Sequence, residues 1–180
     1  MSPAVGVLVA AVSFVAMEGV SYLAHRFVMH RAGMVWHRSH HRPASGRVER
    51  NDLFPVCFSI VGVALFALGT TGPAVVALVW AGIGVTVYGG AYLFVHEVYI
   101  HRRLPVPVPA LAYLEWLRDA HRVHHRHGGE PYGMLLPLVS RSRRDQAAPG
   151  PDRDRDPLSR DPRALRAARA VSTRDARMRL

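Results

Sequence analysis

The sequence predicts an all-α integral membrane protein, a helical bundle with histidine clusters at the cytoplasmic ends of its helices. Three observations support this fold class. Apolar runs cover residues 3–24, 53–69 and 74–95, the turn between the second and third carries no charge, and the flanking segments are rich in arginine. About 20 helical residues cross a hydrocarbon core roughly 30 Å thick.

The first run, residues 3–24, is long enough to span the bilayer as a helix. It has no basic segment before it and no small-residue cleavage site after it, so we interpret it as a retained span and not as a signal peptide. Glu18 is the only charged residue within any of the three runs. A carboxyl group at such a depth is costly and usually functional.

The second and third runs are separated by a turn at residues 70–73, where Pro73 suits the first turn of a new helix. The third run contains several glycines that would allow other helices to approach closely. These are Gly82, Gly84, Gly89 and Gly90. Three spans would place the N-terminus on one side of the membrane and the remainder of the chain, after the third span, on the other.

The charge distribution predicts which side is which. The net charge is +10, and every basic residue apart from histidine is arginine. Within residues 1–140 every arginine lies in the segments 26–50 and 102–126, so both segments should be cytoplasmic by the positive-inside rule. We attribute this excess of positive charge to loops that face an anionic inner leaflet and not to nucleic-acid binding. We therefore expect a multi-pass protein of the inner, cytoplasmic membrane.

Beyond the third run, a proline-rich connector at residues 105–109 precedes a predicted helix from about Ala110 to His125, which Gly128 and Gly129 should end. The short apolar stretch 132–139 leaves open a fourth membrane-embedded element between residues 105 and 140. Residues 141–180 are dominated by Arg, Asp, Pro, Ala and Ser, which predicts a disordered tail. The membrane domain is thus expected to be residues 1–140.

Ten of the eleven histidines form four clusters in a repeated order of spacings. They are His25 and His30; His37, His40 and His41; His96 and His101; and His121, His124 and His125. Neutral imidazole is a common ligand of transition metals, and ten rings are too many for a single ion with three or four protein ligands. The topology brings all four clusters to one face of the membrane, which predicts two adjacent metals.

The spacings predict different backbones. Rings at i, i+3 and i+4 share one face of a helix, so each triplet can converge on one metal or straddle two. Rings at i and i+5 diverge by about 140° on a straight α-helix. We therefore expect a distortion such as a π-bulge at His25–His30 and at His96–His101. His127 lies outside the pattern and is interpreted as a surface residue.

All-nitrogen ligation leaves the full charge on a metal, which suits iron that activates O2 for attack on a C–H bond. Zinc would fit hydrolysis, but no nucleophile elbow or HExxH motif is present. A b-type haem protein for electron transfer remains an alternative, although its ligands would lie within the spans. A metal transporter is a further alternative that would need more polar residues within the membrane than Glu18.

The motifs HRFVMH, HRSHH, NDLF, FVHEVYIHRR and AHRVHHRHGG resemble those of bacterial β-carotene hydroxylases, within the membrane fatty-acid hydroxylase and sterol desaturase superfamily. The resemblance covers residues 19–136. It implies a non-haem di-iron monooxygenase that uses O2 and electrons from a ferredoxin-type donor. The implied reaction converts β-carotene to β-cryptoxanthin and then zeaxanthin in the bilayer, and the resemblance carries over all ten clustered histidines as iron ligands. Hydroxylation, ketolation or desaturation of another lipid is the alternative within this class.

Two acidic residues are candidates for supporting the ligands. Glu18 lies seven residues before His25, on the same helix face, and is expected to accept an imidazole N–H. Asp52, after Asn51, is expected either to cap the second span or to accept a hydrogen bond from a ligand histidine. Glu115 and Asp119 are interpreted as solvated or paired with arginine.

Overall fold

The computed structural model describes residues 1–41, 48–104 and 106–137, and all regular structure in these ranges is helical. The predicted disorder of residues 141–180 lies outside the described residues. Within these ranges, three helical segments are long and apolar enough to cross a membrane: Pro3–Met29, Arg50–Gly69 and Ala77–Ile100. The predicted number of spans, three, is confirmed for the described residues.

The first span consists of helix α1 (Pro3–Leu23), which continues into a π-helix, η1 (Ala24–Met29). The short helix α2 (Met34–His37) follows after a turn. The second span begins with a 3-10 turn, η2 (Arg50–Asp52), and continues as α3 (Leu53–Gly69). The Glu49 and Asp52 side chains form a capping box at the start of η2, in which Asp52 accepts from the Glu49 backbone N–H at 2.8 Å.

The third span starts after the turn η3 (Pro73–Val75), with Pro73 in its first position as predicted. It comprises α4 (Ala77–Tyr92) and a second π-helix, η4 (Leu93–Ile100). The final helix, α5 (Ala112–His127), ends at Gly128, whose φ of 67° satisfies the left-handed conformation that glycine favours. The prediction that Gly128 ends this helix is confirmed.

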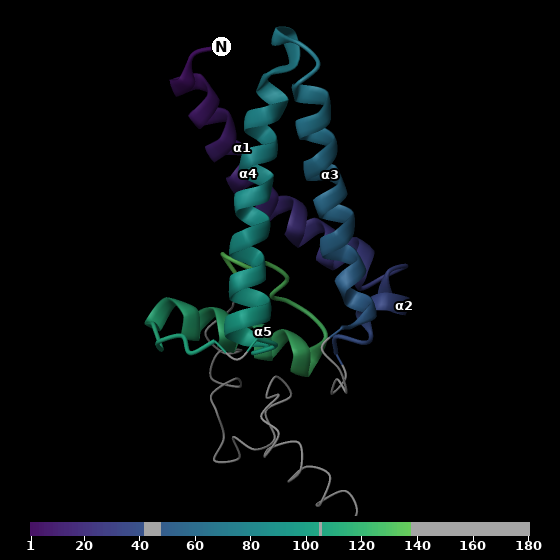
Figure 1. Cartoon of the computed structure of the whole chain (residues 1–180). Helices are drawn as coiled ribbons and strands as arrows, with labels where there is room; N and C mark the ends of the chain where they lie inside the picture. The colour runs from purple at the N-terminus through teal and green to yellow at the C-terminus, as the bar shows by residue number, and fades with distance from the viewer. Residues whose placement is uncertain (42–47, 105, 138–180) are drawn as a thin grey trace, which may run out of the picture.

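Helix α4 packs between α1 and α3. Figure 1 shows the N-terminus and the α3–α4 turn at one end of the bundle, and α5 lying across the opposite end, beneath α4. The buried core lies at this α5 end, where Tyr99 and Ile100 of η4 pack on Leu114 and Leu117 of α5 and on Met134. Helix α5 therefore closes the base of the bundle and does not cross the membrane as a span.

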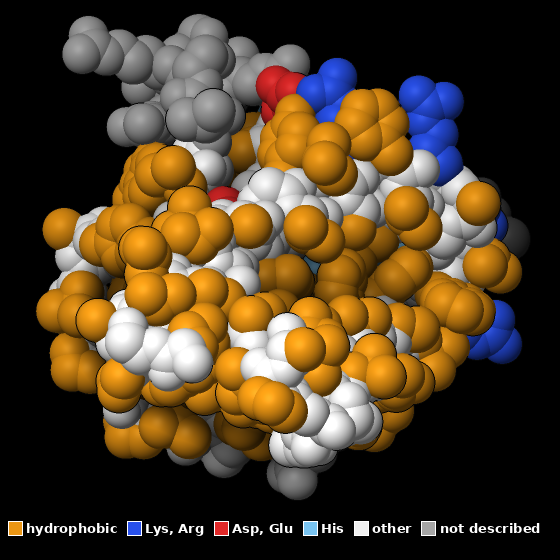
Figure 2. Space-filling model, turned by 90° about the horizontal axis from the view of Figure 1, so that it is seen from above, with side chains coloured by type: hydrophobic (Ala, Val, Ile, Leu, Met, Phe, Trp, Pro, Cys, Tyr) orange, Lys and Arg blue, Asp and Glu red, His pale blue; other side chains and the backbone are white. Residues whose placement is uncertain are grey.

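The outer surface of the spans is apolar. Val15, Ile60 and Val63 are among the large hydrophobic side chains exposed by 60% or more, as expected for residues that contact lipid. Figure 2, which views the molecule from the end that carries the N-terminus, shows a surface covered largely by hydrophobic side chains, with a hollow between the helices and arginines at the rim. In Figure 1 the short helix α2 and helix α5, which belong to the arginine-rich segments, lie toward the end opposite the N-terminus.

Candidate metal centre

Each of the two π-helices brings together a pair of histidines that are five residues apart, His25 with His30 and His96 with His101. In η1 the His30 N–H donates to the His25 carbonyl at 3.1 Å, and in η4 the His101 N–H donates to the His96 carbonyl at 2.9 Å. These are i to i+5 hydrogen bonds, which widen the helix and place residue i+5 above residue i. The two ring centroids are 5.1 Å apart in the first pair and 4.6 Å apart in the second. The predicted distortion is confirmed at both positions.

The two histidine triplets do not both lie on one face of a helix. Only His37 of the first triplet lies in a helix, at the end of α2, and His40 and His41 follow in a turn. The triplet His121, His124 and His125 does lie on α5 as expected. Both triplets distribute their rings between two groups.

These groups define two histidine clusters. The first histidine cluster contains His25, His30, His37, His41 and His124. The second histidine cluster contains His40, His96, His101 and His121. His125 joins the second, because its Nε2 atom lies 3.0 Å from that of His40 and 2.9 Å from that of His121. His127 is exposed and belongs to neither.

Within each cluster the Nε2 atoms face one another. In the first, His37 Nε2 lies 3.1 Å from that of His25, 3.2 Å from that of His30 and 3.0 Å from that of His41. In the second, the corresponding separations run from 2.9 Å to 3.4 Å. Two imidazoles bound to one metal at about 2.1 Å and at right angles would have their nitrogens about 3.0 Å apart.

The opposite ring nitrogens fix the tautomers. Nδ1–H of His25 donates to the Tyr132 carbonyl at 3.1 Å, that of His124 to the Gly129 carbonyl at 2.6 Å, and that of His37 to the Asn51 amide oxygen at 2.8 Å. An imidazole that is neutral and protonated on Nδ1 directs a lone pair from Nε2 into the cluster. Several lone pairs about 3 Å apart repel unless a cation lies between them, so the donor set fits a metal ion.

Burial, with smaller contributions from neighbouring imidazoles, lowers the pKa of His37 to about 3 and that of His41 to about 4. The pKa values of His40, His121 and His124 are also well below the ordinary value, chiefly because of burial. Neutral imidazole is the form that binds metals, so the unprotonated state is favoured at physiological pH.

The second cluster is supported by carboxylates. Nδ1–H of His96 donates to Glu97 at 2.6 Å, and Arg103 in turn donates to Glu97 at 2.6 Å and to both oxygens of Asp52 at 2.6 Å. The buried carboxylate of Glu49 lies 3.5 Å from Nδ1 of His40. Asp52 is therefore connected to His96 through Arg103 and Glu97.

The predicted contact between Glu18 and His25 is wrong. Glu18 accepts instead from the Tyr88 hydroxyl at 2.7 Å and from the backbone N–H groups of Met134 and Leu136, each at 2.9 Å, and of Leu135 at 3.1 Å. Seven residues of helix separate Glu18 and His25 by about 10 Å along the axis, too far for contact even on the same face. Glu18 therefore fixes the segment that follows Tyr132, whose carbonyl holds His25.

Sequence reasoning also missed Asn51, Glu49 and Glu97 as partners of ring nitrogens. Asn51 makes the contact that was expected of its neighbour Asp52. Glu97 directly follows His96 in the chain, and this position was a usable signal. The carbonyls of Gly129 and Tyr132 have no sequence signature, because every residue has a carbonyl. The interpretation of Glu115 and Asp119 as partners of arginine is confirmed, with Arg118 and Arg122 respectively.

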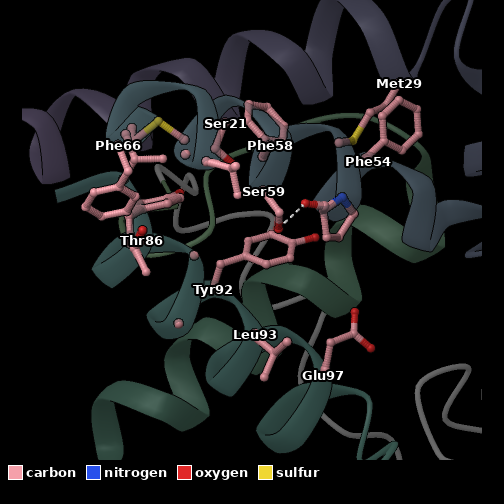
Figure 3. A pocket seen from close by; sticks show the side chains of 18 residues that line it. Ser21, Met29, Phe54, Phe58, Ser59, Phe66, Thr86, Tyr92, Leu93 and Glu97 are labelled. Atoms are coloured by element: carbon pink, nitrogen blue, oxygen red, sulfur yellow. Dashed lines mark hydrogen bonds between the residues drawn. The ribbon is translucent and has the colours of Figure 1, made fainter. Parts of the chain in front are cut away.

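A cavity of about 560 Å³ lies between α1, α3 and α4, directly beside the two clusters. Figure 3 shows its largely apolar lining, with Phe54, Phe58 and Phe66 from α3 facing Tyr92 and Leu93. Tyr92 stacks on His96 of the second cluster, with centroids 4.9 Å apart, and Phe54 makes an edge contact with His37 of the first. Tyr92 and Phe54 thus connect the cavity lining with one histidine of each cluster.

Helical spans that carry two all-histidine centres beside an apolar cavity define an integral membrane metalloprotein. Nitrogens this close together leave no room for a porphyrin between them, which disfavours the haem alternative. The chain belongs to the fatty acid hydroxylase family, whose sequence pattern matches residues 10–142.

Several relatives are similar over most of their length. The β-carotene hydroxylase of Pseudescherichia vulneris is 44% identical over 133 residues, which are 71% of this chain and 74% of the relative. That of Pantoea ananas is 40% identical over 133 residues, 71% of this chain and 75% of the relative. That of a Paracoccus species is 35% identical over 134 residues, 73% of this chain and 82% of the relative. No solved structure matches the chain.

Proposed function

We propose that this chain is a β-carotene hydroxylase that converts β-carotene to β-cryptoxanthin and then to zeaxanthin. The observation that carries the proposal is the convergence of ten imidazoles in two clusters beside an apolar cavity within the spans. The names of the similar bacterial proteins support the substrate. The ten histidines are the proposed ligands of two non-haem iron ions.

When bound, iron supplies the reduction of O2 that hydroxylation of an unactivated C–H bond requires. The chain supplies orientation and access. Asn51, Glu97 and the carbonyls of Gly129 and Tyr132 hold their histidines in the Nδ1–H tautomer, so that Nε2 remains a ligand. The aromatic and aliphatic lining of the cavity excludes water. It also accepts a β-ionone ring directly from the bilayer.

The proposed setting is the inner, cytoplasmic membrane, with both clusters on the cytoplasmic side. Exposed Arg31, Arg38, Arg50 and Arg102 near the cluster end support this orientation through the positive-inside rule. They also suit an acidic electron donor of the ferredoxin type. The proposed catalytic domain is residues 1–140, which the family match to residues 10–142 supports.

The test is expression of the full chain in a host that accumulates β-carotene, followed by chromatographic identification of the pigments and measurement of bound iron. Wild-type protein is expected to yield zeaxanthin, whereas His40→Ala and His124→Ala should abolish hydroxylation and lower the bound iron, because each removes a ligand from one cluster. His127→Ala, outside both clusters, is the matched control and should behave as wild type.

Zeaxanthin at the wild-type level from either ligand variant would remove that histidine from the ligand set. Unchanged β-carotene with normal iron content, or a ketone or desaturated product, would instead favour the alternative activity on another lipid. Omission of a reduced ferredoxin from a reconstituted assay should stop turnover, which tests the proposed donor.

A further inference from the structure

Two aromatic side chains of the cavity lining are in contact with the histidine clusters. Tyr92 lines the cavity from α4 and stacks on His96, with an angle of 19° between the ring planes. Phe54 lines it from α3 and contacts His37 edge-on, with the ring centroids 6.4 Å apart. Figure 3 shows these two residues among the side chains that face the cavity from α3 and α4. One aromatic ring of the lining therefore lies beside each cluster.

Both aromatic rings are held in place by packing. Phe54 is only 8% exposed, makes an edge contact with Trp36 at 5.5 Å and fits against Gly33, where a Cβ atom would lie 2.8 Å from the end of its ring. Tyr92 lies flat on His96, which is itself buried and hydrogen-bonded. Each aromatic ring thus rests on an imidazole whose Nε2 atom faces into a cluster. The two rings therefore have a defined position relative to the proposed metals.

The proposed product requires the site to select the less reactive of two neighbouring C–H bonds. Zeaxanthin carries a hydroxyl group at C3 of each β-ionone ring, whereas the adjacent C4 is allylic to the ring double bond and has the weaker C–H bonds. Both positions consume the same O2, electrons and protons and give the same hydroxyl group and water. The two carbons are only about 1.5 Å apart. Because a displacement of about 1 Å can change a rate about 100-fold, the side chains that hold the ring can decide the position.

We propose that Phe54 and Tyr92 set the position of hydroxylation, by holding the β-ionone ring so that C3, and not the allylic C4, faces the metals. The proposal rests on the proposed function and deepens it, since it names the side chains that give the reaction its specificity. Removal of either ring leaves a gap on one side of the substrate, next to a cluster histidine. The β-ionone ring can then move toward that gap, and the more reactive C4 comes within reach of the metals.

The experiment expresses full-length variants in a host that accumulates β-carotene and measures the ratio of 4-hydroxylated to 3-hydroxylated carotenoids, together with bound iron. Phe54→Leu and Tyr92→Leu should each raise this ratio about 10- to 100-fold at the wild-type iron content. Tyr92→Phe retains the ring and should keep hydroxylation at C3. Phe58→Leu is the matched control: Phe58 lines the cavity one turn further along α3, and among the described residues it has no ring contact with a cluster histidine. It should keep hydroxylation at C3 even where the yield falls.

Products hydroxylated only at C3 in both leucine variants, or an equal shift in Phe58→Leu, would overturn the inference. Loss of all hydroxylated products from both variants at the wild-type iron content also contradicts it, because a displaced ring is expected to react at C4. If a leucine variant loses its iron, Phe54→Met or Tyr92→Met, which keeps a longer side chain on the histidine, takes its place in the same measurement. A wild-type chain that forms no hydroxylated carotenoid defeats the proposed function, whereas zeaxanthin from the wild type with an unchanged position in the variants contradicts only the inference.

Discussion

At the scale of single residues, the site depends on groups that hold the imidazoles as much as on the imidazoles themselves. His37 is held by Asn51, His96 by Glu97, and His25 and His124 by backbone carbonyls. The sequence identifies the rings, because four clusters in a repeated order are conspicuous. It does not identify their partners, since three of these four are remote in the chain or belong to the backbone.

Glu18 shows how a residue can matter for the site without contacting it. Its carboxylate accepts three backbone N–H groups from residues 134–136 and the hydroxyl of Tyr88. We expect Glu18→Gln to lower the free energy of unfolding by about 1–3 kcal/mol, because an amide can accept through one oxygen only and its NH2 group opposes the backbone donors. Bound iron should fall as well, since Tyr132 and its contact with His25 lie next to this segment.

Thermal unfolding in detergent and metal analysis measure both effects of Glu18→Gln. Tyr88→Phe removes only one of the four donors and is the matched control, with an expected cost of about 1 kcal/mol. Equal losses of stability in the two variants would contradict the role given to the backbone contacts of Glu18.

At the scale of the elements, the π-helices explain why two histidine pairs are spaced five residues apart. An α-helix cannot align residues i and i+5, whereas the wider turns of η1 and η4 do. Two residues after the end of η4 at Ile100, Arg102 has a left-handed φ of 48°, and the Arg103 N–H donates back to the Glu97 carbonyl at 2.8 Å. This turn brings the Arg103 side chain back onto Glu97 and Asp52.

The crossing of α1 and α4 depends on Gly84. A Cβ atom there would lie 2.2 Å from the Ala10 carbonyl oxygen and 2.8 Å from Ser13 Cβ. Gly84→Ala should therefore force the helices apart and destabilise the protein by about 1–3 kcal/mol. Thermal unfolding tests this, with Gly89→Ala as the control, since a Cβ at Gly89 meets nothing within 4 Å. A Gly84→Ala variant as stable as the control would show that this crossing can relax.

At the scale of the whole molecule, the arrangement places an apolar cavity next to the polar histidine clusters, with Tyr92 and Phe54 contacting both. The cavity lies between the spans, and the clusters lie where α5 closes the base of the bundle. This relation between cavity and site follows from the packing of α1, α3 and α4.

Gly62 offers a way to fill that cavity without touching the metal centre. It lines the cavity from α3, and a Cβ there would find only ordinary contacts, the nearest being 3.8 Å from Thr86 Oγ1. Gly62→Leu should lower zeaxanthin formation roughly 10- to 200-fold by occupying the space of the substrate, while bound iron stays at the wild-type level. Pigment analysis and iron analysis of the same preparation measure the two quantities.

The control for Gly62→Leu is Gly19→Leu on α1, where a Cβ meets nothing within 4 Å. It adds the same side chain to a span and should leave hydroxylation unchanged. Full activity of Gly62→Leu would mean that the ring of the substrate binds elsewhere.

The spans, the end of α5 at Gly128 and the π-distortions could be predicted from the sequence, because hydrophobic length, glycine and the i, i+5 spacing act locally along the chain. The number of histidines also indicated two metal sites, because it exceeds what one site can hold. Which rings share a cluster could not be predicted, because it depends on the packing of distant segments. His124 joins His25 while its neighbour His125 joins His40, since two adjacent residues on α5 face different centres once the helix lies across the bundle. The same packing brought Glu18 to the backbone of residues 134–136 and Asn51 to His37, because these contacts depend on how separate segments meet in space.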